Sequence, residues 1–437
     1  MRIIVFFIAF FFFCHPINGQ SNWQWTQLSP LPIATTGNAL CEGNKAGEKH
    51  VYSFGGISDS LYPQHIHNKV FKYKVSDDEW SEVASIPDSM GKLDFQASFV
   101  NNRIYLIGGR YILADSTEIV SEKVNVFSVS LDTFEIDASS PPIPVYGHVQ
   151  SVWRDSLIFV ISGFDGTQNI PEVQIYNPYF NAWTAGDPIP NNDEYKAHGA
   201  AGYILGDTIF YYGGAIHTPH PQAVKILRKG VINANDPTQI DWSLINPSPQ
   251  STHFSGVASG HNNTIFWLGG SKDYHEFNLA LHDTNLVATG INQVIEYTAT
   301  SQFYLNNYLY QSTPYSVMDL NGIAKLGGGN WIIAGGVDSL KQISDRVFLL
   351  HNSSLTDLAK AQHPPIFKVN ELNDFYIAVT ENIGEIVVYD IAGRTIFKSK
   401  KHLSDLYIPK SQLTRGILLF VYEDDFNLPV VIKKINP

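Results

Sequence analysis

The sequence predicts an all-β fold: a six-bladed β-propeller closed by its N-terminal strand and followed by a small C-terminal β-sandwich. A short apolar run ends six times in a small, glycine-containing pair, at Gly55-Gly56, Gly108-Gly109, Ser162-Gly163, Gly213-Gly214, Gly269-Gly270 and Gly335-Gly336. Successive pairs lie 53, 54, 51, 56 and 66 residues apart, the period at which one four-stranded sheet repeats around a propeller. One extra strand signature precedes the first pair, and a different β-rich pattern follows the last repeat.

Each repeat carries further ordered features after its glycine pair. A second β-rich run follows, and then an aromatic residue, as at Trp80, Trp183 and Trp242, opens a final strand that leads into a proline turn such as the one at Pro87. This order resembles the kelch repeat, and the resemblance covers roughly Trp23–Leu350. We expect the glycines to let strand ends bend and neighbouring sheets approach, and each tryptophan to pack between blades.

Strand counting predicts how the ring closes. A final-strand signature, Trp25–Pro32, stands before the first glycine pair, whereas Arg346–Leu350 follows the sixth pair without a tryptophan strand after it. The N-terminal strand should therefore complete the last blade. Sharing one sheet between the two ends of the domain leaves no open strand edges.

Composition narrows the class of function. The 437 residues are 44% hydrophobic, 13% aromatic and only 16% charged, which is typical of a well-packed β protein. The net charge of −12 and the absence of a basic stripe argue against nucleic acid as a partner. Of the two cysteines, Cys41 falls in the first predicted strand of the first blade, where we expect a buried structural thiol.

The N-terminus is typical of an export signal. Arg2 precedes an apolar core, Ile3–Phe13, that is too short to span a bilayer, and Gly19 before Gln20 offers a cleavage point. We expect residues 1–19 to be removed, with no membrane-spanning segment afterwards. Cys14 admits a lipoprotein alternative, which the preceding phenylalanines fit poorly. Removal would leave Cys41 as the one cysteine, so no disulfide could form within the chain.

The pattern changes after Leu350. We expect a propeller over residues 20–350, a linker over 351–365 and a β-sandwich over 366–437. The last part resembles the C-terminal sorting domain of the type IX secretion system of Bacteroidetes bacteria, on residues Tyr389, Asp390, Gly393, Arg394, Gly416, Lys433 and Lys434. The segment Phe367–Asn370 and the ending at Pro437 depart from that pattern. The resemblance implies recognition by the secretion machinery; an accessory sandwich without an address function is the alternative.

Loops that follow the second strand of each blade should gather on one face, around the mouth of the central channel. The long insertion Ser271–Asn292 is the most individual of these loops. Three histidines recur where first strands begin, and their imidazoles could converge on a metal or an anion, although a structural role in turns is favoured. The candidate binding residues on this rim are Tyr62, Arg110, Tyr111, His148, Asp165, His198, His253, Tyr274 and His275.

The resemblance admits several activities. Copper chemistry like that of galactose oxidase requires a cysteine cross-linked to tyrosine, which Cys41 inside a strand does not suit. An enzyme resembling sialic acid epimerases or mutarotases could use His148, His198, Arg110 and Asp165. No Gly-x-Ser-x-Gly elbow is present. We expect a non-catalytic recognition module for protein or glycan ligands, without cofactor or metal, secreted or held at the outer-membrane surface; a sugar-modifying enzyme and a structural spacer of the cell envelope are the alternatives.

Overall fold

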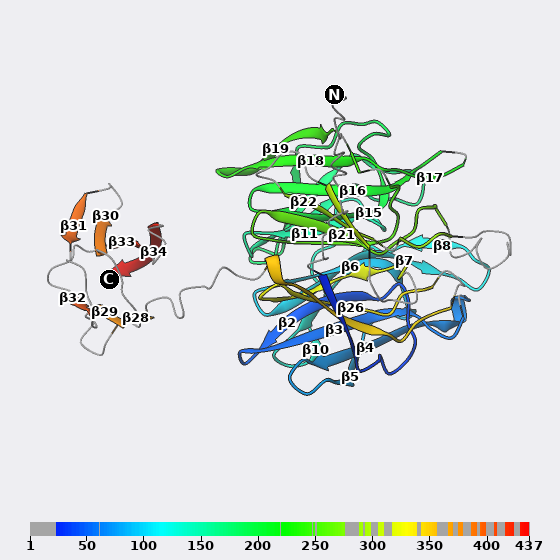
Figure 1. Ribbon diagram of the computed structural model, residues 1–437, viewed down its shortest axis with the longest axis horizontal. Coiled ribbons are helices and arrows are strands. Elements are labelled where there is room, and N and C mark those ends of the chain that lie inside the picture. Colours follow the sequence, from blue (N-terminus) through cyan, green and yellow to red (C-terminus); the bar gives the residue numbers. More distant parts are fainter. Residues whose placement is uncertain are drawn as a thin grey trace, which may run out of the picture. The chain divides into compact units, whose positions relative to one another are not determined.

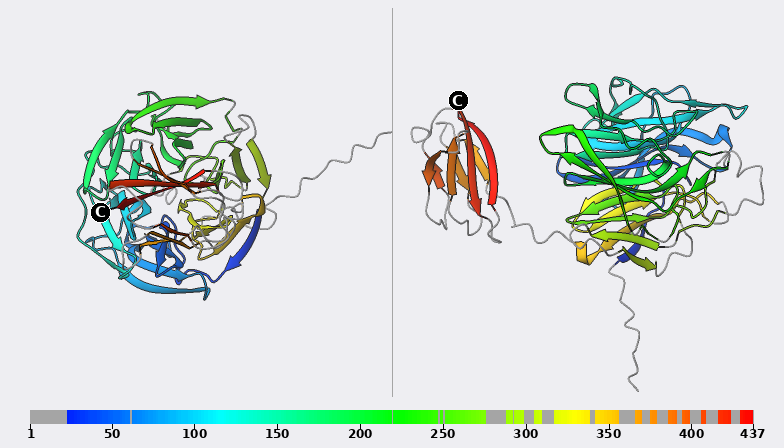
Figure 2. Two further views of the ribbon diagram at one scale, coloured as in Figure 1. Left: turned by 90° about the vertical axis from the view of Figure 1, so that its left-hand side faces the viewer. Right: turned by 90° about the horizontal axis from the view of Figure 1, so that it is seen from above.

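The computed structural model describes residues 23–436, except residues 61, 219, 247, 250, 276–287, 292, 299–304, 310–316, 339–341, 356–365, 370–374, 379–385, 391–393, 399–405, 409–415 and 424–428. The chain divides into two compact units, Met1–Thr356 and Asp357–Pro437, so the division falls inside the expected linker. The first unit is a ring of six β-sheets, which confirms the propeller prediction (Figure 2, left). Its last described elements, β27 (Val347–Asn352) and the 3-10 helix η2 (Ser353–Leu355), run past residue 350.

Each blade is an antiparallel sheet whose first strand lines the channel at the centre of the ring. Figure 1 shows the ring from the side and labels many of its strands. Blade 1 consists of β2 (Ala39–Lys45), β3 (Glu48–Ile57), β4 (Ile66–Lys74) and β5 (Glu79–Ser85), with η1 (Pro63–His65) before β4. Blade 2 consists of β6 (Leu93–Val100), β7 (Arg103–Ile112), β9 (Val124–Ser128) and β10 (Thr133–Phe134), with β8 (Glu118–Val120) beside β7. Blade 3 consists of β11 (Val149–Trp153), β12 (Leu157–Ile161), β13 (Val173–Asn177) and β14 (Ala182–Gly186).

The second half of the ring repeats this plan. Blade 4 consists of β15 (His198–Leu205), β16 (Thr208–Ile216), β18 (Leu227–Asn233) and β19 (Asp236–Ile245), with β17 (Gln222–Ala223) beside β16. Blade 5 consists of β20 (Val257–His261), β21 (Thr264–Leu268), β22 (Gln293–Thr298) and β23 (Leu305–Leu309). Blade 6 consists of β25 (Ala324–Gly327), β26 (Asn330–Ala334), β27 and the N-terminal strand β1 (Trp23–Leu28).

Strand β1 closes the ring as the sequence predicts. It pairs antiparallel with β27 over its full length, from Trp23 opposite Asn352 to Leu28 opposite Val347. A second connection joins the same two blades at the centre, where β24 (Asn321–Gly322) runs parallel to β2 and pairs with Ala39 and Leu40. Blades 6 and 1 are therefore joined both at the outer edge of the ring, through β1, and at its centre, through β24.

The glycine pairs bring neighbouring blades into contact. Gly108, Gly213 and Gly335 have positive φ, and a Cβ on any of them would lie 2.1–2.3 Å from a backbone oxygen of the next blade's first segment. In blades 2 to 6 the second residue of the pair donates its N–H to the next blade's first segment, as from Gly109 to Val145 O at 3.0 Å and from Gly214 to His253 O at 2.7 Å. The pairs are conformational requirements of the ring.

The final-strand tryptophans connect each blade to the preceding one. The Trp80 indole donates to Ser29 O at 3.1 Å, the Trp183 indole to Ser139 O at 2.8 Å and the Trp242 indole to Asp187 O at 3.0 Å. Each acceptor follows the last strand of the preceding blade. Trp80 and Trp183 also pack on a tyrosine of the third strand, with ring centroids 5.0 Å apart. The tyrosine thus holds the indole within its own blade, and the indole N–H makes the contact with the preceding blade.

The second unit contains two sheets. One joins β28 (Ile366–Val369), β29 (Phe375–Ala378) and β32 (Leu406–Ile408); the other joins β31 (Thr395–Lys398), β30 (Ile386–Asp390), β33 (Gly416–Glu423) and β34 (Pro429–Asn436). Tyr389 and Asp390 end β30, Gly416 begins β33, and Lys433 and Lys434 lie in β34, whereas Gly393 lies outside the described residues. In the part of the chain that the structure describes, no helix is long and apolar enough to cross a membrane.

Substituting Gly322→Ala tests the inner connection between blades 6 and 1. A Cβ at this position would lie 2.3 Å from Leu40 O and 2.5 Å from Leu40 N, so β24 must leave β2. We expect a loss of about 3 kcal/mol or more in the free energy of unfolding, measured by urea titration. Gly186→Ala is the matched control, because its Cβ would meet only side-chain atoms at 3.1 Å or beyond. Equal losses for the two variants would show that the inner connection does not support closure.

Candidate functional site

Six residues with left-handed backbone surround the mouth of the channel on the face where the glycine pairs lie. This collar consists of Gly37, Asp94, Gly147, Gly199, Ser255 and Asp319, one at the start of each blade, with φ between 50° and 64°. Backbone hydrogen bonds run around it, from Gly147 to Asp94 O at 3.1 Å, from Gly199 to Gly147 O at 2.7 Å and from Ser255 to Gly199 O at 2.9 Å. These hydrogen bonds tie the first segments of neighbouring blades together at the mouth of the channel.

A small cavity of about 50 Å³ lies at this collar, and we call it the mouth pocket. Its walls come from blades 2 to 6 and include five of the predicted rim residues: Arg110, His148, His198, Tyr274 and His275. The sequence analysis did not single out its other side chains, among them Asp94, Tyr146, Phe254 and Asp319. The clue to Asp94 and Asp319 would have been their places in the repeat, equivalent to Gly147 and Gly199.

Arg110, on β7 directly after a glycine pair, is held by two carboxylates. Its Nε lies 2.7 Å from Asp94 Oδ2 and its Nη1 lies 2.5 Å from Glu118 Oε1, while the guanidinium stacks 4.6 Å from the centre of the Tyr146 ring. Burial alone would lower the pKa of Arg110, but Asp94, Tyr146 and Glu118 together outweigh burial and raise the pKa above the usual value. Arg110 is a fixed cation of the wall whose charge is already balanced.

His198 begins β15 and presents an imidazole in one defined tautomer. Asn169 donates from Nδ2 to Ala215 O, so its Oδ1 faces His198 Nδ1 at 2.9 Å and accepts the proton there. Nε2 of the neutral ring is then an acceptor, and among the described residues it has no hydrogen-bond partner. Burial, with Arg110 nearby, lowers the pKa of His198 to about 3. The ring is therefore neutral at physiological pH.

His148 sits beside the collar in blade 3. Its Nε2 lies 3.1 Å from Gln150 Oε1, and Gln150 donates to Ser98 Oγ at 2.8 Å, so the amide orientation makes Nε2 the protonated nitrogen. Burial lowers the pKa of His148 to about 4. This histidine is also neutral, and it marks the point where the mouth pocket meets the channel.

His275, at the start of the long insertion, forms the second charged pair of the pocket. Its Nε2 lies 2.7 Å from Asp319 Oδ1 of the collar, and its Nδ1 lies 3.1 Å from Ser271 Oγ. Burial would lower the pKa of His275, but Asp319 outweighs burial and raises it to about 9. The neighbouring Tyr274 packs edge-on against His198 and Phe254, at 5.6 and 5.1 Å between centroids. The described base of the insertion thus contributes an ion pair and an aromatic wall.

The other predicted rim residues lie elsewhere. Tyr62 is 45% exposed at the end of the loop after β3. Tyr111 points away from the mouth and donates to Asp88 Oδ2 at 2.9 Å, and Asp165 accepts the N–H groups of Thr167 and Gln168 in a turn. His253 is fully buried against Tyr212 and does not line the pocket. The three histidines at first-strand starts therefore do not converge.

Metal ligation gains no support from this geometry. Over the described ranges, no group of three His, Cys, Asp or Glu side chains is arranged to hold an ion. Cys41 is buried in β2 within the apolar layer between blades 1 and 2, and burial raises the pKa of its thiol. It is accordingly a packing residue of the core.

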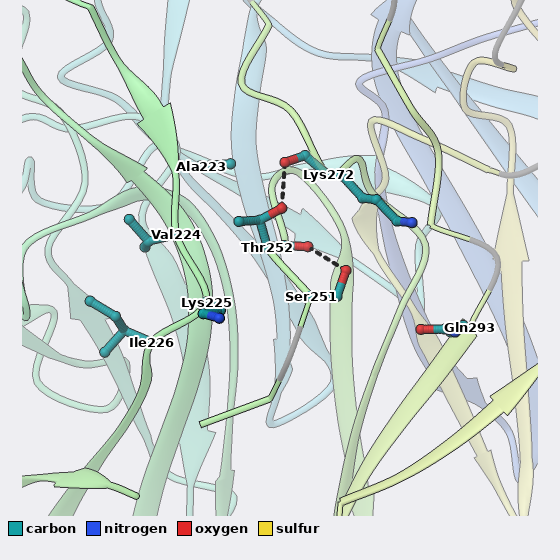
Figure 3. A pocket seen from close by; sticks show the side chains of 8 residues that line it. All are labelled: Ala223, Val224, Lys225, Ile226, Ser251, Thr252, Lys272 and Gln293. Carbon is teal, nitrogen blue, oxygen red and sulfur yellow. Dashed lines mark hydrogen bonds between the residues drawn. The ribbon is translucent and has the colours of Figure 1, made fainter. Parts of the chain in front are cut away.

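A second, more open cavity of about 690 Å³ lies between blades 4 and 5 (Figure 3). It is lined by Ala223, Val224, Lys225, Ile226, Ser251, Thr252, Lys272 and Gln293. Thr252 donates its hydroxyl to Lys272 O at 2.5 Å, and Ser251 donates to Thr252 O at 3.1 Å. None of the predicted rim residues reaches this cavity, and its hydroxyls bond to its own backbone. The mouth pocket is the site with converging polar groups.

Comparisons with known proteins agree with the fold. No protein-family model matches the chain. It is similar to Kelch-like protein 35 of Mus musculus, at 26% identity over 208 residues, 45% of this chain and 30% of that protein. It is also similar to Kelch repeat and BTB domain-containing protein 12 of Homo sapiens, at 24% identity over 175 residues, 37% of this chain and 27% of that protein. The matched part spans less than a third of these relatives.

A solved structure, titled "Structure of YjhT", has a TM-score of 0.57 to this chain at 14% identity, and the match covers 73% of this chain and 95% of that one. At this identity the likeness concerns the fold alone. The six sheets, the repeated glycine and tryptophan contacts and the kelch relatives together define the first unit as a kelch-type β-propeller. Such propellers commonly act as protein-interaction modules.

Proposed function

We propose that the propeller is a non-catalytic recognition module that binds a protein or glycan ligand on the glycine-pair face and anchors it at the mouth pocket. The observation that carries this proposal is the convergence on one small polar cavity of five side chains from blades 2 to 5: Arg110, His148, His198, Tyr274 and His275. Fixed polar groups beside aromatic surface favour an oriented ligand over non-specific contact.

The size of the pocket indicates what enters it. A volume of about 50 Å³ accepts a few water molecules or one small projecting group. It is too small for a sugar ring or a large side chain. His198 Nε2 offers an acceptor at its wall, which suits a donor such as a hydroxyl or an amine. The ligand is therefore a larger molecule that inserts one donor group and rests on the surrounding rim.

The charge states of the pocket disfavour the enzymatic alternative. A general base works best when its pKa lies near the working pH, whereas the pKa values of His198 and His148 are about 3 and 4. Both are weak bases, and at neutral pH neither ring carries the second proton that a general acid would donate. Arg110 and His275, the two cations, are already engaged by carboxylates. A sugar epimerase or mutarotase and a structural spacer remain the alternatives that binding assays separate.

We further propose that the chain is exported, with residues 1–19 as a signal peptide and the second unit as a type IX secretion sorting domain. The supporting observations are the N-terminal apolar run and the compact β-rich unit, in which Tyr389 and Asp390 end β30 and Arg394 directly precedes β31. The protein would then be secreted or retained at the outer-membrane surface. Its partners would be the secretion machinery, through the second unit, and the ligand of the propeller.

A pair of tyrosine variants tests the recognition proposal. Tyr274→Ala removes the aromatic wall of the mouth pocket, and we expect binding to the best ligand on glycan and peptide arrays to weaken about tenfold or more. The matched control is Tyr62→Ala, which removes an exposed tyrosine outside the pocket. Thermal unfolding of both variants monitors the fold. Equal effects of the two substitutions would show that the mouth pocket is not the binding site. Conversion of the ligand to a product would show that the protein is an enzyme.

A further inference from the structure

The channel behind the mouth pocket is a further cavity, of about 720 Å³, and is much larger than the mouth pocket. The two cavities share Gln96, His148 and Asn321, so the channel begins where the mouth pocket ends. It extends to the opposite face, where its walls include Asn102 and Asp155 in the turns between first and second strands. Its volume lies within the range of about 300–1,000 Å³ that is typical of small-molecule sites.

The walls of the channel are largely backbone. Consecutive residues line it in several blades, such as 96–102, 148–152 and 256–259, which requires the strand edge itself to face the cavity because side chains alternate. Strands β6, β11, β15 and β20 each stand at the end of their sheet as described. Their outer edges present backbone N–H and C=O groups in alternation, of which Ala201 O already accepts from the Trp267 indole and Gly260 O from Lys325. An occupant that both donates and accepts hydrogen bonds satisfies these groups best.

Lys325 and Glu42 add a fixed donor and a fixed acceptor to the channel wall. Lys325, on β25, reaches past blade 5 to blade 4: its Nζ donates to Gly260 O at 2.7 Å and to Tyr203 Oη at 3.2 Å. One of its three N–H bonds is left for an occupant. Glu42 Oε2 accepts the backbone N–H of Lys325 at 3.1 Å, and Lys325 and Glu42 form no ion pair with each other.

The charges that line the channel are balanced. Two lysines, Lys49 and Lys325, stand beside two carboxylates, Glu42 and Asp155. A ligand with a net charge would be attracted by either the lysines or the carboxylates and repelled by the other pair. An apolar ligand would leave the backbone N–H and C=O groups of the strand edges without hydrogen-bond partners.

We propose that the channel is a binding site for a neutral, hydroxyl-rich small molecule of the size of a mono- or disaccharide. Each hydroxyl group donates and accepts, as the alternating strand edges require. Tyr203, Lys325 and Glu42 orient the molecule at the end of the channel away from the mouth. This site is separate from the mouth pocket and does not depend on the function proposed for it.

Saturation-transfer NMR on the full chain tests this proposal, with maltose, trehalose and myo-inositol as neutral probes and trialanine as a peptide contrast. We expect transfer to at least one neutral probe, with a dissociation constant in the millimolar range or tighter. Lys325→Met removes the free N–H and should weaken binding about tenfold, whereas Tyr203→Phe keeps its ring beside Lys325 and should weaken it about threefold. Lys69→Met, at an exposed lysine of blade 1, is the matched control.

Several outcomes would overturn the channel site. Absence of transfer to every neutral probe would leave water as its occupant, and preference for trialanine would make it a peptide site. Loss of sugar binding in Tyr274→Ala but not in Lys325→Met would place the sugar at the mouth pocket instead. If Lys325→Met fails to fold by circular dichroism, Tyr203→Phe decides, because it removes a single hydroxyl.

Discussion

Removing residues 1–28 is expected to abolish cooperative unfolding of the propeller. The deletion takes away β1, whose six residues pair with β27, and with it Trp23, which is 6% exposed and packs 4.7 Å from Phe266 and 5.6 Å from Trp331. The loss of a buried tryptophan alone costs about 3–5 kcal/mol, close to the whole stability of many domains. Glu296, buried and hydrogen-bonded to the Trp23 indole, would also lose a partner.

A chain that begins at Trp23 is the control for this deletion, because it retains β1. We expect it to unfold in one cooperative transition in urea, monitored by tryptophan fluorescence. Adding a synthetic peptide of residues 23–32 to the shorter chain should restore part of the signal, since the open edge of β27 remains available. Cooperative unfolding of the chain from Ser29 with an unchanged midpoint would contradict closure by β1.

Acid should destabilise the propeller well above the pH at which carboxylates are protonated. His148, His198 and His253 are buried, and burial lowers their pKa values from 6.5 to about 4, 3 and 4. The unfolded chain binds these protons first, so the stability that they contribute is complete above about pH 6.5 and is lost as the pH falls to about 4. Depressions of this size correspond to at most about 3 kcal/mol each for His148 and His253 and about 5 kcal/mol for His198.

On the alkaline side, the free energy of unfolding should fall as the pH rises. Asp319 raises the pKa of His275 to about 9, so its contribution is complete below about pH 6.5 and is lost as the pH rises through 9. Urea titrations between pH 4 and 9 should therefore give a maximum near neutral pH. His253→Leu should make the acid limb shallower by one proton, since it removes one imidazole whose pKa is lowered by burial. A flat profile between pH 6.5 and 4 would contradict the burial of these imidazoles in the neutral form.

The blades could be predicted because their signals are local and periodic. The pair Gly108-Gly109 ends an apolar strand, and the positive φ of its first residue recurs in every blade, with Ser162 in place of glycine in blade 3. Trp80 and Trp183 similarly mark outer strands because each makes the same contact with the blade before it. Closure by β1 followed from counting strand signatures against blades. These features depend on residues close in sequence, or on one repeated contact.

The site was harder to predict because its partners are distant in sequence. Asp319 lies 44 residues from His275 and meets it only because both belong to the collar region. Tyr111 directly follows Arg110 and looked equally available, but strand alternation turns it toward Asp88. Likewise His253 occupies the same kind of position as His148, yet it packs behind the pocket against Tyr212. Sequence pattern indicates the face of the ring but not which side chains enter its centre.

Histidine side-chain NMR on the full chain tests the central claim, that the mouth pocket anchors a ligand without transforming it. Spectra of ¹⁵N-labelled imidazoles would be recorded while the best ligand from the arrays is added, with signals assigned through single substitutions. We predict that the His198 and His148 signals shift with ligand, that the His253 signal does not, and that the ligand is recovered unchanged. Binding that leaves His198 unperturbed, or conversion of the ligand to product, would contradict the account.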